Sequence, residues 1–265
     1  MTRLGCRLPG NVSSPEQLWE FLIQNRSGHC HVPKDRYNAD AFYHPDAGRL
    51  GSINSTGGYF IQADIRAFDN AFFGINNLES RDMDPQQRKL LEVVYEAFEN
   101  AGVPQEHIQG SRTGVFVGNF TNDHLIMQLK DPEYQSRYSA TGLNATILAN
   151  RITHSFDLHG PSLTVDTACS ASLYAFHLAC LSLDAHDCTA AIVASANLIL
   201  SPEHQISITK AGTLSPDSVS HTFDESANGY GRAEAVSAVY LKRLSDAIKD
   251  KDPIRSIIRG TATNG

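Results

Sequence analysis

The sequence has no hydrophobic run long enough to cross a membrane and no leader-like start. None of its apolar stretches approaches the roughly 20 residues that a membrane-spanning helix needs. The first residues, Met-Thr-Arg-Leu-Gly-Cys, are not followed by an apolar run and a cleavage site. We therefore expect a cytoplasmic protein with no membrane attachment.

Cysteine is scarce and odd in number, which is atypical of a disulfide scaffold in a chain of 265 residues. We therefore expect reduced thiols, each of them a candidate for a reactive side chain. The five cysteines are Cys6, Cys30, Cys169, Cys180 and Cys188.

Positive charge is also in short supply. Lysine and arginine total 22 against 29 aspartates and glutamates, the formal net charge is −7, and no run of basic residues occurs. This balance argues against nucleic-acid binding. Repeats, low-complexity tracts and linkers are absent too, and 41% of the residues are hydrophobic, so we expect one domain, or part of one, with a large core.

No complete metal-binding or nucleotide-binding pattern is present. Residues 29–31 read His-Cys-His, and Cys180 and Cys188 form a second pair, but neither group makes a four-ligand set with the usual spacing. Residues 229–234 begin like a dinucleotide fingerprint, yet they lack the third glycine and follow no clear strand. We therefore expect no metal ion and no directly bound cofactor.

What the sequence does contain is an alternation of helix-like and strand-like segments, which favours an α/β fold. The clearest helix begins at Pro85, with Asp84 as N-cap, Gln87 completing a capping box and Gly102 ending it. A shorter helix with a similar capping pattern begins at Pro15. Leu18, Phe21 and Leu22 form the apolar face of this shorter helix, and strands are predicted at residues 113–118, 162–166, 190–196, 235–241 and 254–258.

A further predicted helix follows a predicted strand with almost no connection. Residues 170–183 are apolar or small on every face, which is typical of a central, buried helix. Only Thr167, Ala168 and Cys169 separate it from the strand at residues 162–166. The chain must therefore turn sharply at Cys169, and this is the geometry of a nucleophile elbow.

A cysteine at such a turn is suited to act as a nucleophile. The first N–H groups of a helix have no intrahelical partner, and the helix dipole presents its positive end there. Both effects favour a thiolate, and the N–H groups suit a developing oxyanion. The commoner alternative is that Cys169 is a small core residue packed beside alanines, so its position alone leaves both interpretations open.

The surrounding residues favour the first interpretation. Residues 165–173 read Val-Asp-Thr-Ala-Cys-Ser-Ala-Ser-Leu, which resembles the active-site signature of β-ketoacyl synthases, above all the ketosynthase domains of multidomain type I polyketide synthases. Residues 223–234 resemble the second fingerprint of that family, which borders the acyl tunnel; as a bare sequence, this glycine-rich turn equally suits a structural ion-pair cluster around Asp224, Arg232 and Glu234. Other similar segments, in the family's order, are residues 5–10, 83–88, 114–118, 149–152 and 156–162.

The resemblance implies a thiolase-like fold, layered α/β/α/β/α, of which this chain supplies mainly the N-terminal half. It also implies polyketide or fatty-acid biosynthesis by an acyltransferase. An acyl group moves from the phosphopantetheine thiol of an acyl carrier protein to Cys169, and a malonyl-type extender is then decarboxylated and condensed with it. The complete domain is expected to be a homodimer.

The sequence departs from the family in ways that affect catalysis. The second stage depends on two histidines, in His-Gly-Thr-Gly-Thr and Asn-Ile-Gly-His motifs, and neither motif is present. His159 precedes Gly160-Pro161 and is not a match. We therefore expect residues 1–265 to be a β-ketoacyl synthase N-terminal region, truncated at both ends, without its C-terminal half and incomplete as a catalyst. Smaller departures are Ala171 for serine, and Ala194, Ser195, Ala233 and Ala235 where glycine is common.

Two other interpretations remain open at this point. Cys169 could serve a cysteine hydrolase with one of the eleven histidines as base, because nucleophile and base need only meet in space. The chain could also be a non-catalytic fragment or an incomplete gene model that retains a fold and a dimer surface.

Overall fold

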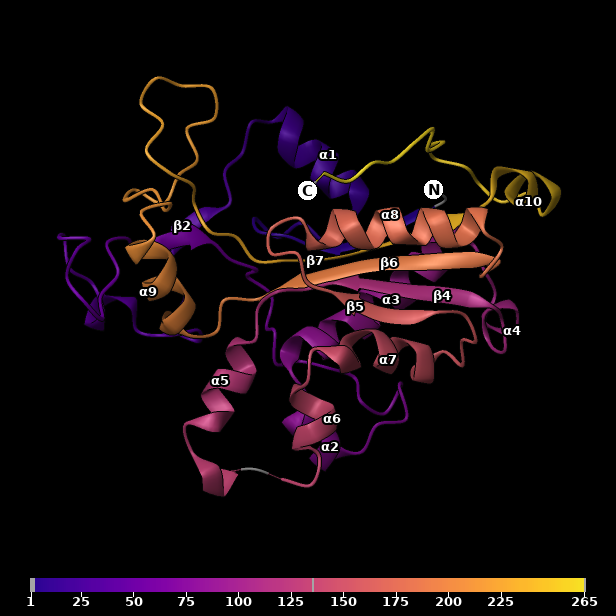
Figure 1. Ribbon diagram of the computed structural model, residues 1–265, viewed down its shortest axis with the longest axis horizontal. Helices are drawn as coiled ribbons and strands as arrows, with labels where there is room; N and C mark the ends of the chain where they lie inside the picture. The colour runs from indigo at the N-terminus through magenta and orange to yellow at the C-terminus, as the bar shows by residue number, and fades with distance from the viewer. Residues whose placement is uncertain (1–2, 135, 265) are drawn as a thin grey trace.

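The computed structural model describes residues 3–134 and 136–264, which form a mixed sheet with helices on both faces (Figure 1). The strand order is β1-β7-β6-β4-β5. Strand β7 is antiparallel to both β1 and β6, whereas β6, β4 and β5 are parallel. The strands are β1 (Arg3–Arg7), β4 (Thr113–Gly118), β5 (Ser162–Val165), β6 (Ala190–Asn197) and β7 (Ala235–Lys242), and a separate antiparallel pair is formed by β2 (His29–His31) and β3 (Gly57–Tyr59).

Helices α3 (Pro85–Ala101) and α7 (Thr146–Ser155) cover one face of the sheet, and α8 (Ala171–Asp184) lies on the other (Figure 1). No helix in the described ranges combines the length and apolar character that crossing a membrane requires. The remaining helices are α1 (Pro15–Ile23), α2 (Asn77–Asp82), α4 (Gln105–Ile108), α5 (Asp123–Leu129), α6 (Ser139–Leu143), α9 (Pro202–Lys210) and α10 (Leu244–Lys249), with 3₁₀ turns at Ala39–Ala41 and Pro132–Tyr134.

The core follows the alternation of side chains along the strands. In β4, Val115 and Val117 join the apolar cluster under α3 and α7, while Phe116 between them joins the cluster under α8. The sequence predicted β4 with its observed bounds, and it predicted β5, β6 and β7 to within one residue. The predicted α/β class is therefore confirmed, with three of its layers formed by this chain.

Helix α3 is confirmed, but one detail of its cap is wrong. Asp84 accepts a hydrogen bond from the Gln86 N–H at 2.7 Å, and Gly102 ends the helix at φ 68°. Gln87 does not complete a capping box, because the Asp84 N–H already donates to the Gly142 carbonyl at 2.9 Å. The Gln87 amide instead donates to the same carbonyl at 2.9 Å, which ties α3 to the end of α6.

Helix α1 begins at Pro15 as predicted, and its apolar face is only partly covered. Ser14 caps the helix by accepting from the Gln17 N–H at 3.2 Å. Leu22 and its neighbours Trp19 and Ile23 are each more than 60% exposed. The predicted apolar face is therefore partly covered, because Leu18 and Phe21 are half-buried and the Phe21 ring lies beside Gly10 and the Arg26 guanidinium.

Two expectations about the other face of the sheet are wrong. Helix α8 is buried only toward the sheet, where Ala175 and Ala179 are fully covered, and Leu173 on its outer side is 71% exposed. Residues 254–258 form no strand, because they pair with neither edge strand of the sheet, β1 or β5. The segment instead runs across α8, where Ile258 packs against the α8 cluster (Figure 1).

Candidate active site

Cys169 lies where β5 passes into α8, and it is exposed to solvent. Strand β5 ends at Val165 and α8 begins at Ala171, so residues 166–170 make the whole turn. The predicted elbow is therefore present. The interpretation of Cys169 as a buried core residue is wrong, because no core packing covers it.

The backbone of the elbow is held in an unusual conformation. Ala168 has φ 53°, in the left-handed region that residues with a Cβ rarely adopt. Asp166 accepts a hydrogen bond from the Ala168 N–H at 2.9 Å, and the Ser170 hydroxyl donates to the Thr167 carbonyl at 2.8 Å. Such strain costs about 1–2 kcal/mol and persists only where surrounding contacts impose it. These local hydrogen bonds fix the turn that presents Cys169.

The start of α8 rests directly on the end of β4. A Cβ at Gly118 would lie 2.4 Å from the Ser172 nitrogen, far closer than real side chains approach. The next residue, Asn119, donates its backbone N–H to the Val165 carbonyl at 3.1 Å. Gly118 therefore supports the residues that follow Cys169, and Asn119 supports the residues that precede it.

This placement suits a nucleophile better than those of Cys6 and Cys180. Burial raises the pKa of the Cys6 thiol and, further along α8, that of Cys180. Cys169 instead sits exposed immediately before the first turn of a 14-residue helix, where N–H groups and the helix dipole favour an anion. The arrangement can hold a thiolate and stabilise an oxyanion beside it.

No histidine in the described ranges forms a hydrogen bond with Cys169. His177, on the same helix, pairs with the Thr261 hydroxyl at 2.7 Å, and His204 packs edge-on against Phe120. The cysteine-hydrolase interpretation needs a histidine base within reach of the thiol, and it gains no support here.

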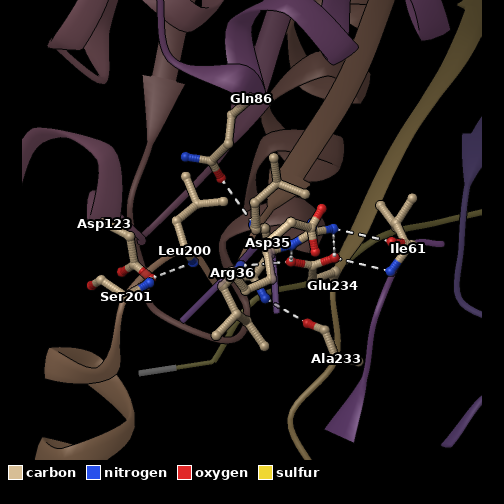
Figure 2. A network of polar contacts seen from close by, with 12 residues as sticks. Asp35, Arg36, Ile61, Gln86, Asp123, Leu200, Ser201, Ala233 and Glu234 are labelled. Atoms are coloured by element: carbon tan, nitrogen blue, oxygen red, sulfur yellow. Dashed lines mark hydrogen bonds and ion pairs between the residues drawn. The ribbon is translucent and has the colours of Figure 1, made fainter. Parts of the chain in front are cut away.

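The second fingerprint is the anchor of a buried ion-pair network (Figure 2). Glu234 is fully buried and binds Arg36 through both carboxylate oxygens, at 2.8 and 2.9 Å. The same carboxylate accepts the backbone N–H groups of Ile61 at 2.9 Å and Ile199 at 3.0 Å. Burial lowers the pKa of Arg36, but the pairing with Glu234 and with Asp35 together more than offsets this effect. Glu234 therefore joins residues 36, 61 and 199, which are far apart in the sequence.

Arg232 and Asp224, the other charged residues of the second fingerprint considered above, differ in burial and in hydrogen bonding. Arg232 is buried and donates to Gln205 at 3.2 Å, and burial lowers its pKa. The Asp224 carboxylate is exposed and accepts from the backbone N–H and the hydroxyl of Ser226, two residues later in the turn. The structural ion-pair interpretation is therefore confirmed for Glu234, whose partner is Arg36, but it extends neither to Arg232, which binds the neutral Gln205, nor to Asp224.

The alanine and serine residues at positions where glycine is common fit their backbone without strain. Ala194, Ser195, Ala233 and Ala235 all lie outside the left-handed region. Replacing glycine by a residue with a side chain costs little stability where φ is negative. These departures therefore leave the local fold intact.

The weaker motifs receive structural roles. The His29 ring packs edge-on against Tyr59, and His31 lies 3.3 Å from Asp40. Across the described residues, no three His, Cys, Asp or Glu side chains are grouped as a metal site would require. Residues 229–234 lead into β7 and not into a helix, so they cannot present the helix N-terminus that a dinucleotide needs.

Two buried amides near the elbow were missed by the sequence reasoning. Gln86 and Asn119 are 2% and 4% exposed, and they hydrogen-bond to each other at 3.1 Å. Their signal was the presence of polar side chains at the ends of strongly apolar elements. Only the fold shows that α3 and β4 bring them together.

Comparison with known proteins identifies the family. Residues 2–247 match the profile described as "Beta-ketoacyl synthase, N-terminal domain". Curated relatives include highly reducing polyketide synthase 19 of Pyricularia oryzae and srdA of Neurospora crassa, each 59% identical over 261 residues. The chain spans 10% and 11% of the length of these relatives, and they cover 98% of the chain.

Solved structures agree with this assignment. The module 6 ketosynthase of the bacillaene synthase from Bacillus subtilis has a TM-score of 0.86 and 33% identity over 96% of this chain, which spans 42% of that structure. The oxazolomycin ketosynthase domain OzmH KS7 has a TM-score of 0.87, also at 33% identity, and the chain spans 44% of it. The expected thiolase-like fold is confirmed by these ketosynthase domains, and the chain belongs to the β-ketoacyl synthase family, whose N-terminal domain it contains.

Proposed function

We propose that this chain carries the acyl-accepting nucleophile, Cys169, of a polyketide-synthase ketosynthase that forms carbon–carbon bonds by decarboxylative Claisen condensation. The observation that carries the proposal is the position of Cys169: exposed, on a strained elbow, at the start of α8. The 59% identity to highly reducing polyketide synthases supports the same reaction.

The first stage is a thioester exchange. The Cys169 thiolate attacks the carbonyl carbon of an acyl thioester on the phosphopantetheine of an acyl carrier protein. The carbonyl oxygen becomes an oxyanion, which N–H groups at the start of α8 are positioned to stabilise. The intermediate collapses, the carrier thiolate leaves and takes up a proton, and the acyl group stays on Cys169. One thioester replaces another, so the step is nearly isoenergetic by bond type.

The second stage consumes that thioester. A malonyl-type extender on the carrier loses carbon dioxide, and the resulting carbanion attacks the acyl carbonyl on Cys169. The new carbon–carbon bond forms as the Cys169 thiolate is expelled, which regenerates the nucleophile. The chain binds no cofactor of its own in this scheme, because the phosphopantetheine belongs to the carrier protein.

We further propose that residues 1–265 act as the N-terminal part of a larger domain. The two histidine motifs on which the second stage of the family reaction depends are absent from the sequence. The chain also spans less than half of each solved ketosynthase to which it was compared. Leu173 and Leu181 on the outer side of α8 stay exposed although the segment after α10 runs across this helix, and they suit contact with the rest of such a domain.

The complete domain would act as a homodimer in the cytoplasm. The edge position of β5 offers a strand for pairing with a second copy, and the five cysteines are all free thiols, as a reducing compartment would keep them. The net charge of −7 gives no attraction to nucleic acid.

The test is a condensation assay on the native full-length protein that contains this chain. With an acyl donor and a malonyl-loaded carrier protein, we expect carbon dioxide and a β-ketoacyl product. Cys169→Ala should abolish product, whereas Cys180→Ala, a half-buried cysteine on the same helix, should retain it. Product formation by Cys169→Ala at the wild-type rate would overturn the proposal. The 265-residue chain alone should yield no product.

A further inference from the structure

We propose that Gln86 and Asn119 are positioning residues for acyl transfer, which set the place of the elbow that carries Cys169. The inference rests on the proposed function, since it assigns these two amides a role in the same reaction. Neither residue touches Cys169 in any described contact, so their effect must pass through the backbone on either side of the elbow.

Asn119 is the link between the elbow and the centre of the sheet. Its backbone N–H donates to the carbonyl of Val165, the last residue of β5, at 3.1 Å. Its side-chain amide donates to the Ala196 carbonyl in β6 at 3.0 Å and to Gln86 at 3.1 Å. Because Asn119 directly follows Gly118, it fixes the end of β4 on which Ser172 rests. One residue therefore controls both supports of the elbow.

Gln86 in turn fixes Asn119 from α3. Its side-chain oxygen accepts from the Asn119 amide and also from the Leu198 N–H and the Thr121 hydroxyl, both at 3.3 Å. Figure 2 shows the Gln86 side chain reaching from its helix toward the segment after β6. Its amide nitrogen donates to Asp84 and to the Thr121 carbonyl, each at 3.3 Å. A buried oxygen with three donors has little freedom to move.

A small shift at this point matters for the reaction. Thioester exchange requires the thiolate, the carbonyl carbon and the oxyanion donors to be aligned together. Misplacement by about 1 Å can cost about 10²-fold in rate. Alkylation of the same thiol by iodoacetamide needs no oxyanion donor, so it depends far less on the position of the elbow.

A matched pair of variants separates positioning from general stability. Gln86→Met removes the amide that holds Asn119. Gln87→Met removes an equally buried amide from the next position of α3, where the amide binds Thr141 and Gly142. In the native full-length protein, we would measure the single-turnover rate of Cys169 acylation at saturating acyl-phosphopantetheine thioester. The rate of iodoacetamide alkylation at Cys169 and the folded fraction would be measured in parallel.

We expect Gln86→Met to slow acylation by about 10- to 100-fold with alkylation nearly unchanged, and Gln87→Met to leave both rates unchanged. Asn119→Ser, whose side chain no longer reaches Ala196 or Gln86, should reproduce the selective loss. A reduced acylated fraction at an unchanged rate constant would indicate a merely structural role and overturn the proposal. So would equal acylation rates in Gln86→Met, Asn119→Ser and wild type, or the failure of both variants to fold. If wild type itself is not acylated at Cys169, the proposed function fails and the inference falls with it.

Discussion

Gly118 offers the sharpest perturbation of the elbow. In Gly118→Ala, the new Cβ would lie 2.4 and 2.5 Å from the nitrogen and Cα of Ser172, and 2.6 Å from the carbonyl carbon of Ala171. All three atoms belong to the backbone, so no side-chain rotation relieves the contact. Ordinary contact begins at 3.4 Å, and the first turn of α8 must therefore move by about 1 Å.

The expected result is a loss of both rate and stability. A shift of about 1 Å predicts an acylation rate lower by about 10²-fold, and overpacking should lower the free energy of unfolding by about 1–3 kcal/mol. Single-turnover acylation of Cys169 and urea denaturation of the native full-length protein measure the two effects.

Gly102→Ala is the control for this perturbation. Its φ of 68° makes alanine unfavourable by about 1–2 kcal/mol, but a Cβ there meets no atom within 4 Å, and Gly102 lies at the far end of α3. We expect it to lower stability without changing the acylation rate. Wild-type acylation by folded Gly118→Ala would refute the claim that contact with β4 sets the position of the elbow.

Two further predictions concern stability. Glu234→Gln removes the fully buried one of the two carboxylates that pair with Arg36, the other being Asp35 at 2.8 Å, so the free energy of unfolding should fall by about 3 kcal/mol. In urea denaturation the exposed control Asp224→Asn should change it by less than about 0.5 kcal/mol, and equal effects would contradict the assigned network. Burial and then Arg232 lower the pKa of His204 below its ordinary value of 6.5, so the unfolded chain binds the proton first as pH falls. Wild type should therefore lose stability relative to His204→Gln as pH falls from about 6.5 through the lower folded pKa, with no such relative change above about pH 7.5; a difference independent of pH would rule this out.

The sequence predicted the elements that carry their own local signals. Helix α3 has a cap at Asp84 and a stop at Gly102, and β4 is a short apolar segment between glycines, so their bounds were read correctly. The elbow was predictable because only Thr167, Ala168 and Cys169 separate an apolar strand from a long apolar helix. These features depend on neighbours in the sequence.

The features that were missed depend on contacts between distant segments. Residues 254–258 look like a strand but pack against α8 and pair with no strand of the sheet, and Leu173 looks buried but faces outward from α8. The Gln86–Asn119 pair joins residues 33 positions apart. Glu234 binds Arg36, which lies 198 positions away in the sequence. No local pattern specifies which buried polar groups will meet.

The most direct test of the central claim is to locate the acyl group. The native full-length protein is incubated with an acyl-phosphopantetheine thioester, digested, and analysed by mass spectrometry, so that all five cysteine-containing regions are compared in one sample. We predict one acyl group on the peptide that contains Cys169 and none on peptides that contain Cys6, Cys30, Cys180 or Cys188. Acylation that persists in Cys169→Ala, or that resides on another cysteine of the wild-type protein, would contradict the role of Cys169 as the nucleophile.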